Sequence, residues 1–280
     1  MTGVSLAIDV SKVHGQRQFS QADSVAVEEP LEIQLCSGSA EDSAAKSISI
    51  TMRTPGDDAE LAVGFLFTEA IITSASQVAS VQHCGAPAPD TGFRNVIRVE
   101  LEPDVHIDLS RLERHFYTTS SCGVCGKTSL DALRVGGQHP LTKVTTTFPR
   151  EAIVTLPDKL REQQRVFSKT GGLHAAAVFT PDGEITLVRE DVGRHNAVDK
   201  VIGALLLANR VPAHELGLLV SGRASFELMQ KALVAGLPLL AAVGAPSSLA
   251  VSLAKEFDMT LVGFLRQGNF NIYSRAERLA

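Results

Sequence analysis

Cys122 and Cys125 lie three positions apart in the segment Cys-Gly-Val-Cys-Gly-Lys, which places two thiols where they can act together. Such a pair can hold a metal, form a reversible disulfide or carry sulfur. Gly123 and Gly126 make the surrounding backbone adaptable, which core cysteines rarely need. Lys127, and a helix expected to begin beside it, favour the thiolate form of a nearby cysteine. The segment therefore indicates reactive sulfur, with an incidental pair of cysteines as the plain alternative.

The number of available ligands argues against the metal interpretation. A structural zinc ion takes four ligands, commonly from two C-x-x-C pairs or from one pair and two histidines. The remaining cysteines, Cys36 and Cys84, are isolated in the sequence. Zinc deaminases also need an H-x-E or C-x-E upstream of P-C-x-x-C, but no such triplet occurs here and residue 121 is Ser121. We therefore expect no metal site.

Two further chemistries compete with sulfur transfer. Gly126-Lys127-Thr128 resembles the end of a phosphate-binding P-loop, but the first glycine of that motif would fall on Ser121. Thioredoxin-like disulfide exchange stays open, although the chain upstream lacks the expected β-α-β start. In a sulfur relay, a thiolate attacks a persulfide, holds the outer sulfur as Cys–S–SH and passes it on. We favour this third chemistry.

Composition excludes several classes of function. Of the 280 residues, 44% are hydrophobic, so the chain can bury a sizeable core. A net charge of −5, with both signs mixed along the chain, argues against nucleic-acid and membrane partners. The longest apolar run, residues 235–245, is shorter than the ~20 residues that span a bilayer and contains Gly236 and Pro238. Four cysteines are too few for a disulfide scaffold, so we expect a reducing cytoplasm.

The hydrophobic pattern predicts two structured parts after a loose segment at residues 1–25. Residues 26–115 are expected to form an N-terminal α+β part, and residues 116–280 a second domain that carries the cysteine pair. Alternation predicts strands in the first part, and an apolar run after Thr54-Pro55-Gly56 predicts a helix. The expected strands of this part are 25–35, 46–52 and 93–101, and the helix is 59–72.

The second part alternates strands and helices, which is typical of an α/β sheet covered on both faces. We expect a hairpin of two strands first, and then helices and buried strands in turn. The predicted strands are 173–179, 185–189, 216–220, 237–243 and 259–265. The predicted helices are 157–167, 195–208, 224–235 and 246–256.

Polar residues follow three of these strands, in the stretches 189–196, 221–223 and 244–248. Each stretch leads from a strand into a helix, and helix N-termini attract anions. An N-capped helix with a solvated charge cluster is the plain alternative for residues 189–196, and a lone histidine such as His174 is more often structural. Arg266 and Asn269 flank a turn that could bind a ligand or merely close a hairpin. Together the strand ends predict one edge that binds an anionic or nucleotide-like ligand.

These segments resemble one family, the formate dehydrogenase accessory sulfurtransferases known as FdhD. The resemblance runs from about Glu29 to Tyr273, and the first 25 residues lie outside it. It rests on long stretches in a fixed order, namely residues 120–127, 170–176, 189–200, 221–223, 226–227, 231–232 and 261–264.

The resemblance implies sulfur transfer from a cysteine desulfurase to the molybdenum cofactor, bis-molybdopterin guanine dinucleotide, before its insertion into formate dehydrogenase. It implies that Cys122 carries the persulfide and that Cys125 assists. It also implies a homodimer, affinity for GDP or GMP, and a cytidine-deaminase-like three-layer α/β/α fold with an added N-terminal part. The residues expected to bind the cofactor are Phe264, Leu265, Arg266, Gln267, Gly268, Asn269, His174, Arg194, His195, Ser221 and Arg223.

Two other functions remain open from the sequence. The chain could be a non-catalytic chaperone that only carries the molybdenum cofactor. It could also be a thiol–disulfide oxidoreductase that uses its C-x-x-C pair.

Overall fold

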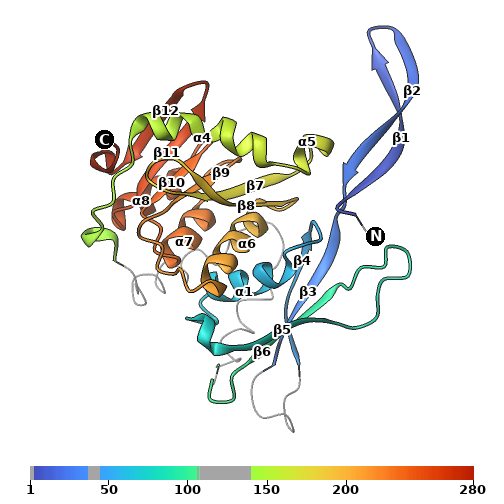
Figure 1. Ribbon diagram of the computed structural model, residues 1–280, viewed down its shortest axis with the longest axis horizontal. Helices are drawn as coiled ribbons and strands as arrows, with labels where there is room; N and C mark the ends of the chain where they lie inside the picture. The colour runs from blue at the N-terminus through green and yellow to red at the C-terminus, as the bar shows by residue number, and fades with distance from the viewer. Residues whose placement is uncertain (1–2, 37–44, 106, 108–139) are drawn as a thin grey trace.

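The computed structural model describes residues 3–36, 45–105, 107 and 140–280. Its centre is a six-stranded sheet with the order β12-β11-β10-β9-β7-β8 (Figure 1). β9, β10 and β11 run parallel, whereas β7 is antiparallel to both of its neighbours and β12 is antiparallel to β11. The strands are β7 (His174–Phe179), β8 (Ile185–Asp191), β9 (Gly217–Val220), β10 (Leu239–Ala242), β11 (Thr260–Arg266) and β12 (Asn269–Ser274).

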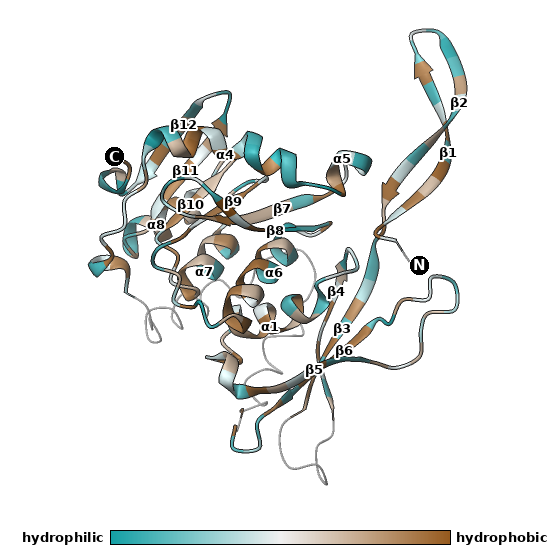
Figure 2. Cartoon of the chain, viewed as in Figure 1, coloured by the Kyte–Doolittle hydropathy of each residue, from teal (hydrophilic) through white to brown (hydrophobic). Residues whose placement is uncertain are grey.

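Helices cover both faces of this sheet. α6 (Arg194–Leu207), α7 (Phe226–Val234) and α8 (Ser248–Glu256) lie on one face, and α4 (Arg150–Gln163) lies on the other (Figure 1). Neighbouring residues of β9, Leu218 and Leu219, are both fully buried but belong to the cores on opposite faces. The inner strands are therefore apolar along their length (Figure 2), as a doubly covered sheet requires. The predicted three-layer α/β/α order is confirmed, and the likeness to cytidine deaminases stays a prediction.

A second sheet holds the N-terminal part of the chain, with the order β4-β3-β6-β5. It consists of β3 (Glu29–Cys36), β4 (Lys46–Arg53), β5 (Val78–Cys84) and β6 (Val96–Leu101), and η1 (Ala75–Gln77) precedes β5. α1 (Asp58–Thr68) lies between this sheet and α6 (Figure 1). One hydrophobic core contains residues of β3, α1, α6, α7 and the central sheet. The two predicted parts therefore share a core, and the expected boundary at 115/116 lies outside the described residues.

Gly64 of α1 and Gly203 of α6 allow these two helices to approach closely. A Cβ atom on Gly64 would lie 1.9 Å from the backbone oxygen of Asp199, and one on Gly203 would lie 1.9 Å from that of Glu60. Real Cβ atoms do not come so close, so the crossing tolerates only glycine at both positions.

The N-terminal segment is the clearest departure from the sequence-based expectation. β1 (Ser5–His14) and β2 (Arg17–Ala26) pair along their whole length as an antiparallel hairpin, so the prediction of a loose segment at 1–25 is wrong in that respect. Many residues of this segment are small or polar, which favoured the prediction of a loose segment. However, apolar residues alternate with polar or small ones along β1. The hairpin projects away from both sheets (Figure 1), and we call it the arm.

Most predicted helices and strands of the second part are confirmed to within a few residues, but α4 begins seven residues earlier than predicted. Pro157, the first residue of the predicted helix, lies inside α4. The short helix α5 (Phe167–Thr170) follows separately and ends at Gly171, whose φ of 66° suits glycine. β5 was not predicted. Short 3-10 turns η2 (Leu141–Lys143) and η3 (Ala276–Arg278) complete the fold, and no helix in the described ranges has the length and apolarity needed to cross a membrane.

Candidate functional site

Five chain segments meet at one edge of the central sheet, which we call the strand-end rim. β8, β9, β10 and β11 all end there, and β7, which is antiparallel to β8 and β9, begins there. Backbone hydrogen bonds link the strand ends: Gly244 N donates to Gly222 O at 2.9 Å, and Phe264 N donates to Gly244 O at 3.0 Å. The predicted convergence of these strand ends is therefore confirmed. The rim comprises residues 174, 194–195, 221–223, 244–246 and 264–266.

Arg194 and His195 begin α6 and stand at the β8 end of the rim. Arg194 Nε and His195 Nε2 are both buried atoms without a hydrogen-bond partner among the described residues. Glu227 Oε2 lies 4.0 Å from His195 Nε2, which is too long for a hydrogen bond. Burial, together with the charges of Arg194 and Lys231, lowers the pKa of His195 to about 4. Unpaired polar atoms at a helix N-terminus suit a bound anion.

His174 and Ser221 stand side by side at the rim. Ser221 Oγ accepts a hydrogen bond from Ala175 N at 2.9 Å, so this hydroxyl already contributes to the pairing of β7 with β9. Burial, and then the charge of Arg194, lowers the pKa of His174. A neutral imidazole can donate to a ligand or accept from it. Arg223 is exposed at the same edge.

A pocket of about 340 Å³ opens at the β11–β12 turn, at the other end of the rim. Phe264 has a φ of 56° and is 37% exposed, although a bulky residue strongly disfavours this backbone conformation. The guanidinium carbon of Arg266 lies 5.9 Å from the centre of the Phe264 ring. Such an exposed aromatic ring beside an arginine can stack on a planar base. The pocket is lined by Phe264, Arg266, Gln267, Asn269, Phe270 and Asn271.

The structure corrects one member of the predicted set and leaves two members unplaced. Leu265 is fully buried and packs in the core that faces α4, so it does not line the pocket. Gly268, with a φ of 73°, shapes the turn. Cys122 and Cys125 lie outside the described residues. Among the residues that the structure does describe, no group of three or more His, Cys, Asp or Glu side chains could hold a metal ion.

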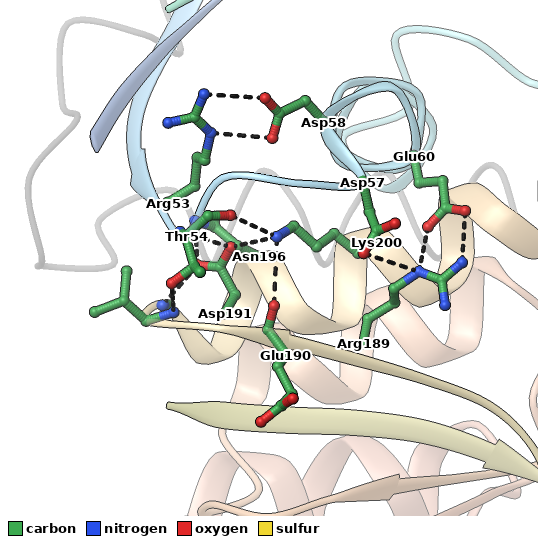
Figure 3. Close-up of polar contacts among 12 residues, drawn as sticks. Arg53, Thr54, Asp57, Asp58, Glu60, Arg189, Glu190, Asp191, Asn196 and Lys200 are labelled. Atoms are coloured by element: carbon green, nitrogen blue, oxygen red, sulfur yellow. Dashed lines mark hydrogen bonds and ion pairs between the residues drawn. The ribbon is translucent and has the colours of Figure 1, made fainter. Parts of the chain in front are cut away.

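A dense polar network lies next to the rim, where the end of β8 and the first turns of α6 meet the segment that precedes α1 (Figure 3). Lys200 Nζ donates to Asp191 Oδ2 at 2.8 Å and to the backbone oxygens of Thr54 and Glu190 at 2.9 and 3.3 Å. Asp191 in turn accepts from Gly193 N at 2.8 Å and from Asn196 Nδ2 at 3.1 Å. The side chains of Lys200 and Asp191 are both fully buried, and the hydrogen bonds and ion pair described above join them to groups of the same chain. We call this network, together with Gly64 and Gly203, the α1–α6 seam.

Two more buried ion pairs flank the seam. Arg53 donates two hydrogen bonds of 3.0 Å to Asp58, and His83 Nε2 lies 2.9 Å from the same carboxylate. Burial alone would raise the pKa of Asp58, but these two partners hold it below its usual value. Lys231 Nζ lies 2.9 Å from Asp199 Oδ1 and 2.8 Å from Thr68 Oγ1, which ties α7 to α6 and α1. The charges of the 189–196 stretch thus divide between the seam and the rim.

Sequence reasoning missed several residues at these sites. Phe270 and Asn271 line the pocket, and the alternation of β12 was the signal that could have found them. The pairing of Lys200 with Asp191 was visible only as a charged stretch. No sequence signal marks the strained backbone of Phe264.

Comparison with known proteins agrees with this architecture. Residues 26–280 match the model of the FdhD/NarQ family. A protein of Streptomyces coelicolor named "Sulfur carrier protein FdhD" is 52% identical over 264 residues, which cover 93% of this chain and 90% of the relative. Relatives of the same name from Mycobacterium tuberculosis and Saccharolobus solfataricus are 47% and 42% identical, each over at least 96% of both chains.

A solved structure also shares the fold. The crystal structure of a candidate formate dehydrogenase accessory protein from Desulfotalea psychrophila covers 99% of this chain and 100% of its own, with a TM-score of 0.75 and 23% identity. The chain therefore belongs to the FdhD/NarQ family.

Proposed function

We propose that this chain is a sulfur carrier in the maturation of formate dehydrogenase, and that it transfers sulfur to the molybdenum cofactor. The observation that carries the proposal is the strand-end rim, which joins unpaired Arg194 and His195 atoms at one end to an aromatic pocket at the other. The names of the relatives, which are sulfur carrier proteins, support the same role.

The dimensions of the rim favour a dinucleotide as the acceptor substrate. β8 and β11 are four strand positions apart, which corresponds to about 19 Å at the usual strand spacing. A mononucleotide does not bridge this span, whereas a dinucleotide can place its phosphates near Arg194 and stack a guanine on Phe264. This arrangement suits bis-molybdopterin guanine dinucleotide. GDP or GMP, which is too short to reach both ends, would bind with its phosphates at the Arg194 end of the same site.

Loading and release of sulfur follow from the chemistry of two thiols. The Cys122 thiolate attacks the outer sulfur of a persulfide on a cysteine desulfurase, so the donor cysteine leaves as a thiolate and Cys122 becomes Cys–S–S⁻. Release of this sulfur as sulfide requires two electrons. The Cys125 thiolate supplies them when it attacks the Cys122 sulfur, which expels sulfide to the acceptor and leaves a Cys122–Cys125 disulfide. Cellular thiols then reduce the pair, consistent with a cytoplasmic location.

Mass spectrometry tests the loading step. After incubation with a cysteine desulfurase and cysteine, the protein should gain the mass of one sulfur atom, and Cys122→Ala should abolish the gain. Cys84→Ala, which changes a half-buried cysteine of β5, is the matched control and should load normally. Cys125→Ser should load but fail to release. Full transfer by Cys122→Ala would contradict the proposal.

Two rival functions predict different outcomes. If the chain only carries the cofactor, formate dehydrogenase should mature in a strain whose copy lacks both thiols. If the chain is a disulfide reductase, it should turn over an external disulfide such as that of insulin. Isothermal titration with GDP tests the rim separately, since absence of binding would remove the support for a nucleotide substrate.

A further inference from the structure

Release of sulfur from the loaded cysteine needs a proton. When the Cys125 thiolate attacks the Cys122 sulfur, the electron pair of the breaking S–S bond stays on the outer sulfur. From the perthiolate Cys–S–S⁻, this sulfur would leave as the sulfide dianion, which is far too basic to be expelled in water. It leaves readily only as hydrosulfide. A group at the point of release must therefore protonate the outer sulfur, and neighbouring donors must stabilise its negative charge.

His174 is placed to supply this proton. It begins β7, and its half-buried imidazole forms no hydrogen bond with any described residue. The ring lies against the end of β9, because a Cβ atom on Gly222 would lie 3.4 Å from His174 Nδ1. Burial lowers the pKa of His174, as does the charge of Arg194 on α6, whereas the charge of Asp191 on β8 raises it. An imidazole with a lowered pKa is a strong acid once protonated, and an approaching perthiolate favours its protonated form.

Unused hydrogen-bond donors lie beside this ring. Gly244 N donates to Gly222 O at 2.9 Å, which holds the loops after β9 and β10 together. By contrast, the backbone N–H groups of Gly222, Arg223 and Ala245 have no acceptor in the described part of the chain. Ser221 Oγ accepts one backbone hydrogen bond, and its own hydroxyl proton has no acceptor among the described residues. Unpaired N–H and O–H donors gathered in this way stabilise a developing anion.

These donors lie between the two ends of the rim. In the sheet order, β10, β9 and β7 separate β11, which ends beside the Phe264 pocket, from β8, which leads to Arg194. A dinucleotide that spans the rim therefore passes directly over His174 and the loops after β9 and β10. Sulfur released at this point meets a bound acceptor rather than open solvent.

Building on the proposed function, we propose that the middle of the rim is the point of sulfide release and that His174 is its acid. The unpaired N–H groups of the two loops hydrogen-bond to the outer sulfur, and protonated His174 gives it a proton as the S–S bond breaks. The thiol pair is oxidised to the Cys122–Cys125 disulfide, and the outer sulfur is reduced and leaves as hydrosulfide. His174 becomes neutral and regains its proton from solvent, so the step needs no further oxidant or reductant.

Single-turnover release of sulfide tests the role of His174. The protein is loaded by a desulfurase and cysteine, separated from both, and followed with a sulfide electrode over a range of pH. The unchanged protein should give a bell-shaped pH profile, because the attacking thiolate forms as the pH rises while the imidazolium disappears. His174→Ala should slow release about a hundredfold and abolish the descending limb, with loading of Cys122 unchanged. His14→Ala, at the exposed end of β1, is the matched control and should behave as the unchanged protein.

Two further measurements separate chemistry from structure. Added imidazole should restore release by His174→Ala, which a merely structural defect would not allow. Gly222→Ala would place a methyl group 3.4 Å from His174 Nδ1 and crowd the donors, so release should slow at least about tenfold. Gly172→Ala, where a Cβ meets its nearest atoms at an ordinary 3.9 Å, is the control for this change.

A titration of the unchanged protein gives an independent check. In backbone amide NMR spectra, hydrosulfide should shift the signals of Gly222, Arg223 and Ala245 in a saturable way, whereas chloride at the same ionic strength should not. Unaltered release by His174→Ala, a descending limb that survives, or amides insensitive to hydrosulfide would each overturn the proposal. Loss of GDP affinity with release intact would also overturn it, because the donors would then hold phosphate. If the unchanged protein does not load sulfur at all, the proposed function itself fails, and the role of His174 fails with it.

Discussion

The α1–α6 seam and the strand-end rim lie next to each other and are both rich in buried polar atoms, but they satisfy those atoms differently. In the seam, the Lys200 ammonium has three close acceptors within the protein. Arg194 and His195 lie at the rim, only a few positions from Lys200 on the same helix. Their Nε and Nε2 atoms have no hydrogen-bond partner among the described residues. Unpaired buried groups cost stability, so the contrast with the well-paired network supports the proposal that a ligand completes these atoms at the rim.

Backbone geometry follows the same division. Glycine at positions 64 and 203 removes strain from the seam, where two helices nearly touch. At the rim, Phe264 keeps a positive φ in spite of its bulk. Strain held in place by surrounding structure is characteristic of binding and catalytic sites. The relaxed backbone of the seam suits a stabilising role, and the strain at the rim supports its proposed role in binding.

The largest expected effect is the loss of close helix contact in the seam. Gly64→Ala should lower the free energy of unfolding by about 3 kcal/mol or more, because the new methyl group would overlap the backbone at Asp199. Chemical denaturation measures this change. Gly172→Ala is the control, since a Cβ there would meet its nearest atoms at an ordinary 3.9 Å. Equal stability of both variants would show that the helices separate readily, which would contradict a rigid seam.

The next effect concerns the buried ion pair. Lys200→Met should cost about 3 kcal/mol in free energy of unfolding, because Asp191 would remain charged and buried without its cation. Lys200→Met/Asp191→Asn removes the uncompensated charge and should recover part of the loss. Asp191→Asn alone gives the reference for this comparison. If Asp191→Asn lowers the free energy of unfolding by the same amount in the Lys200→Met variant as in the unchanged protein, the two residues are not coupled and the network does not act as a unit.

Rim variants should separate binding from stability. Arg194→Gln should lower the affinity for GDP at least about tenfold, because a charged donor to phosphate is lost. The free energy of unfolding should change by no more than about 1 kcal/mol, since Arg194 Nε has no hydrogen-bond partner in the described part of the chain. Titration calorimetry and denaturation measure the two quantities on the same sample. A variant that loses stability without losing affinity would assign Arg194 to the seam rather than to the rim.

Sequence reasoning found the rim more readily than the seam, for a physical reason. Polar residues at strand ends have a local signature, since a buried strand, a short polar stretch and a helix follow one another, as at Val220, Ser221 and Phe226. The partners in the seam are far apart in the chain: Thr54 and Lys200, or Gly64 and Gly203, meet only because two helices cross. The arm was missed because residues 5–26 are rich in small polar residues, which are typical of a loose segment. Their alternation with apolar residues indicates strands only when the pairing of β1 with β2 is considered.

The smallest expected effect is a change in pH dependence at the rim. The pKa of His195 is lowered to about 4 from an ordinary value of 6.5, so the unfolded chain binds a proton between these pH values and the folded chain does not. Stability should therefore fall as the pH drops from 6.5 towards 4, and no contribution from His195 remains above 6.5. Because the side chain is 39% exposed, solvent screening limits the contribution to roughly 1 kcal/mol.

His195→Gln removes this contribution and should give a flatter dependence of unfolding free energy on pH between 4 and 6.5, while the curves run parallel above 6.5. A bound phosphate would favour the protonated imidazole and raise the pKa of His195, so GDP should reduce the same pH dependence in the unchanged protein. The Arg53–Asp58 ion pair beside the seam offers the contrast, because Arg53 and His83 lower the pKa of Asp58, and its contribution is lost only as the pH falls below about 3.8. A ligand that shifts the dependence above pH 4 without altering the loss below it therefore acts at the rim and leaves the ion pairs of the α1 side intact.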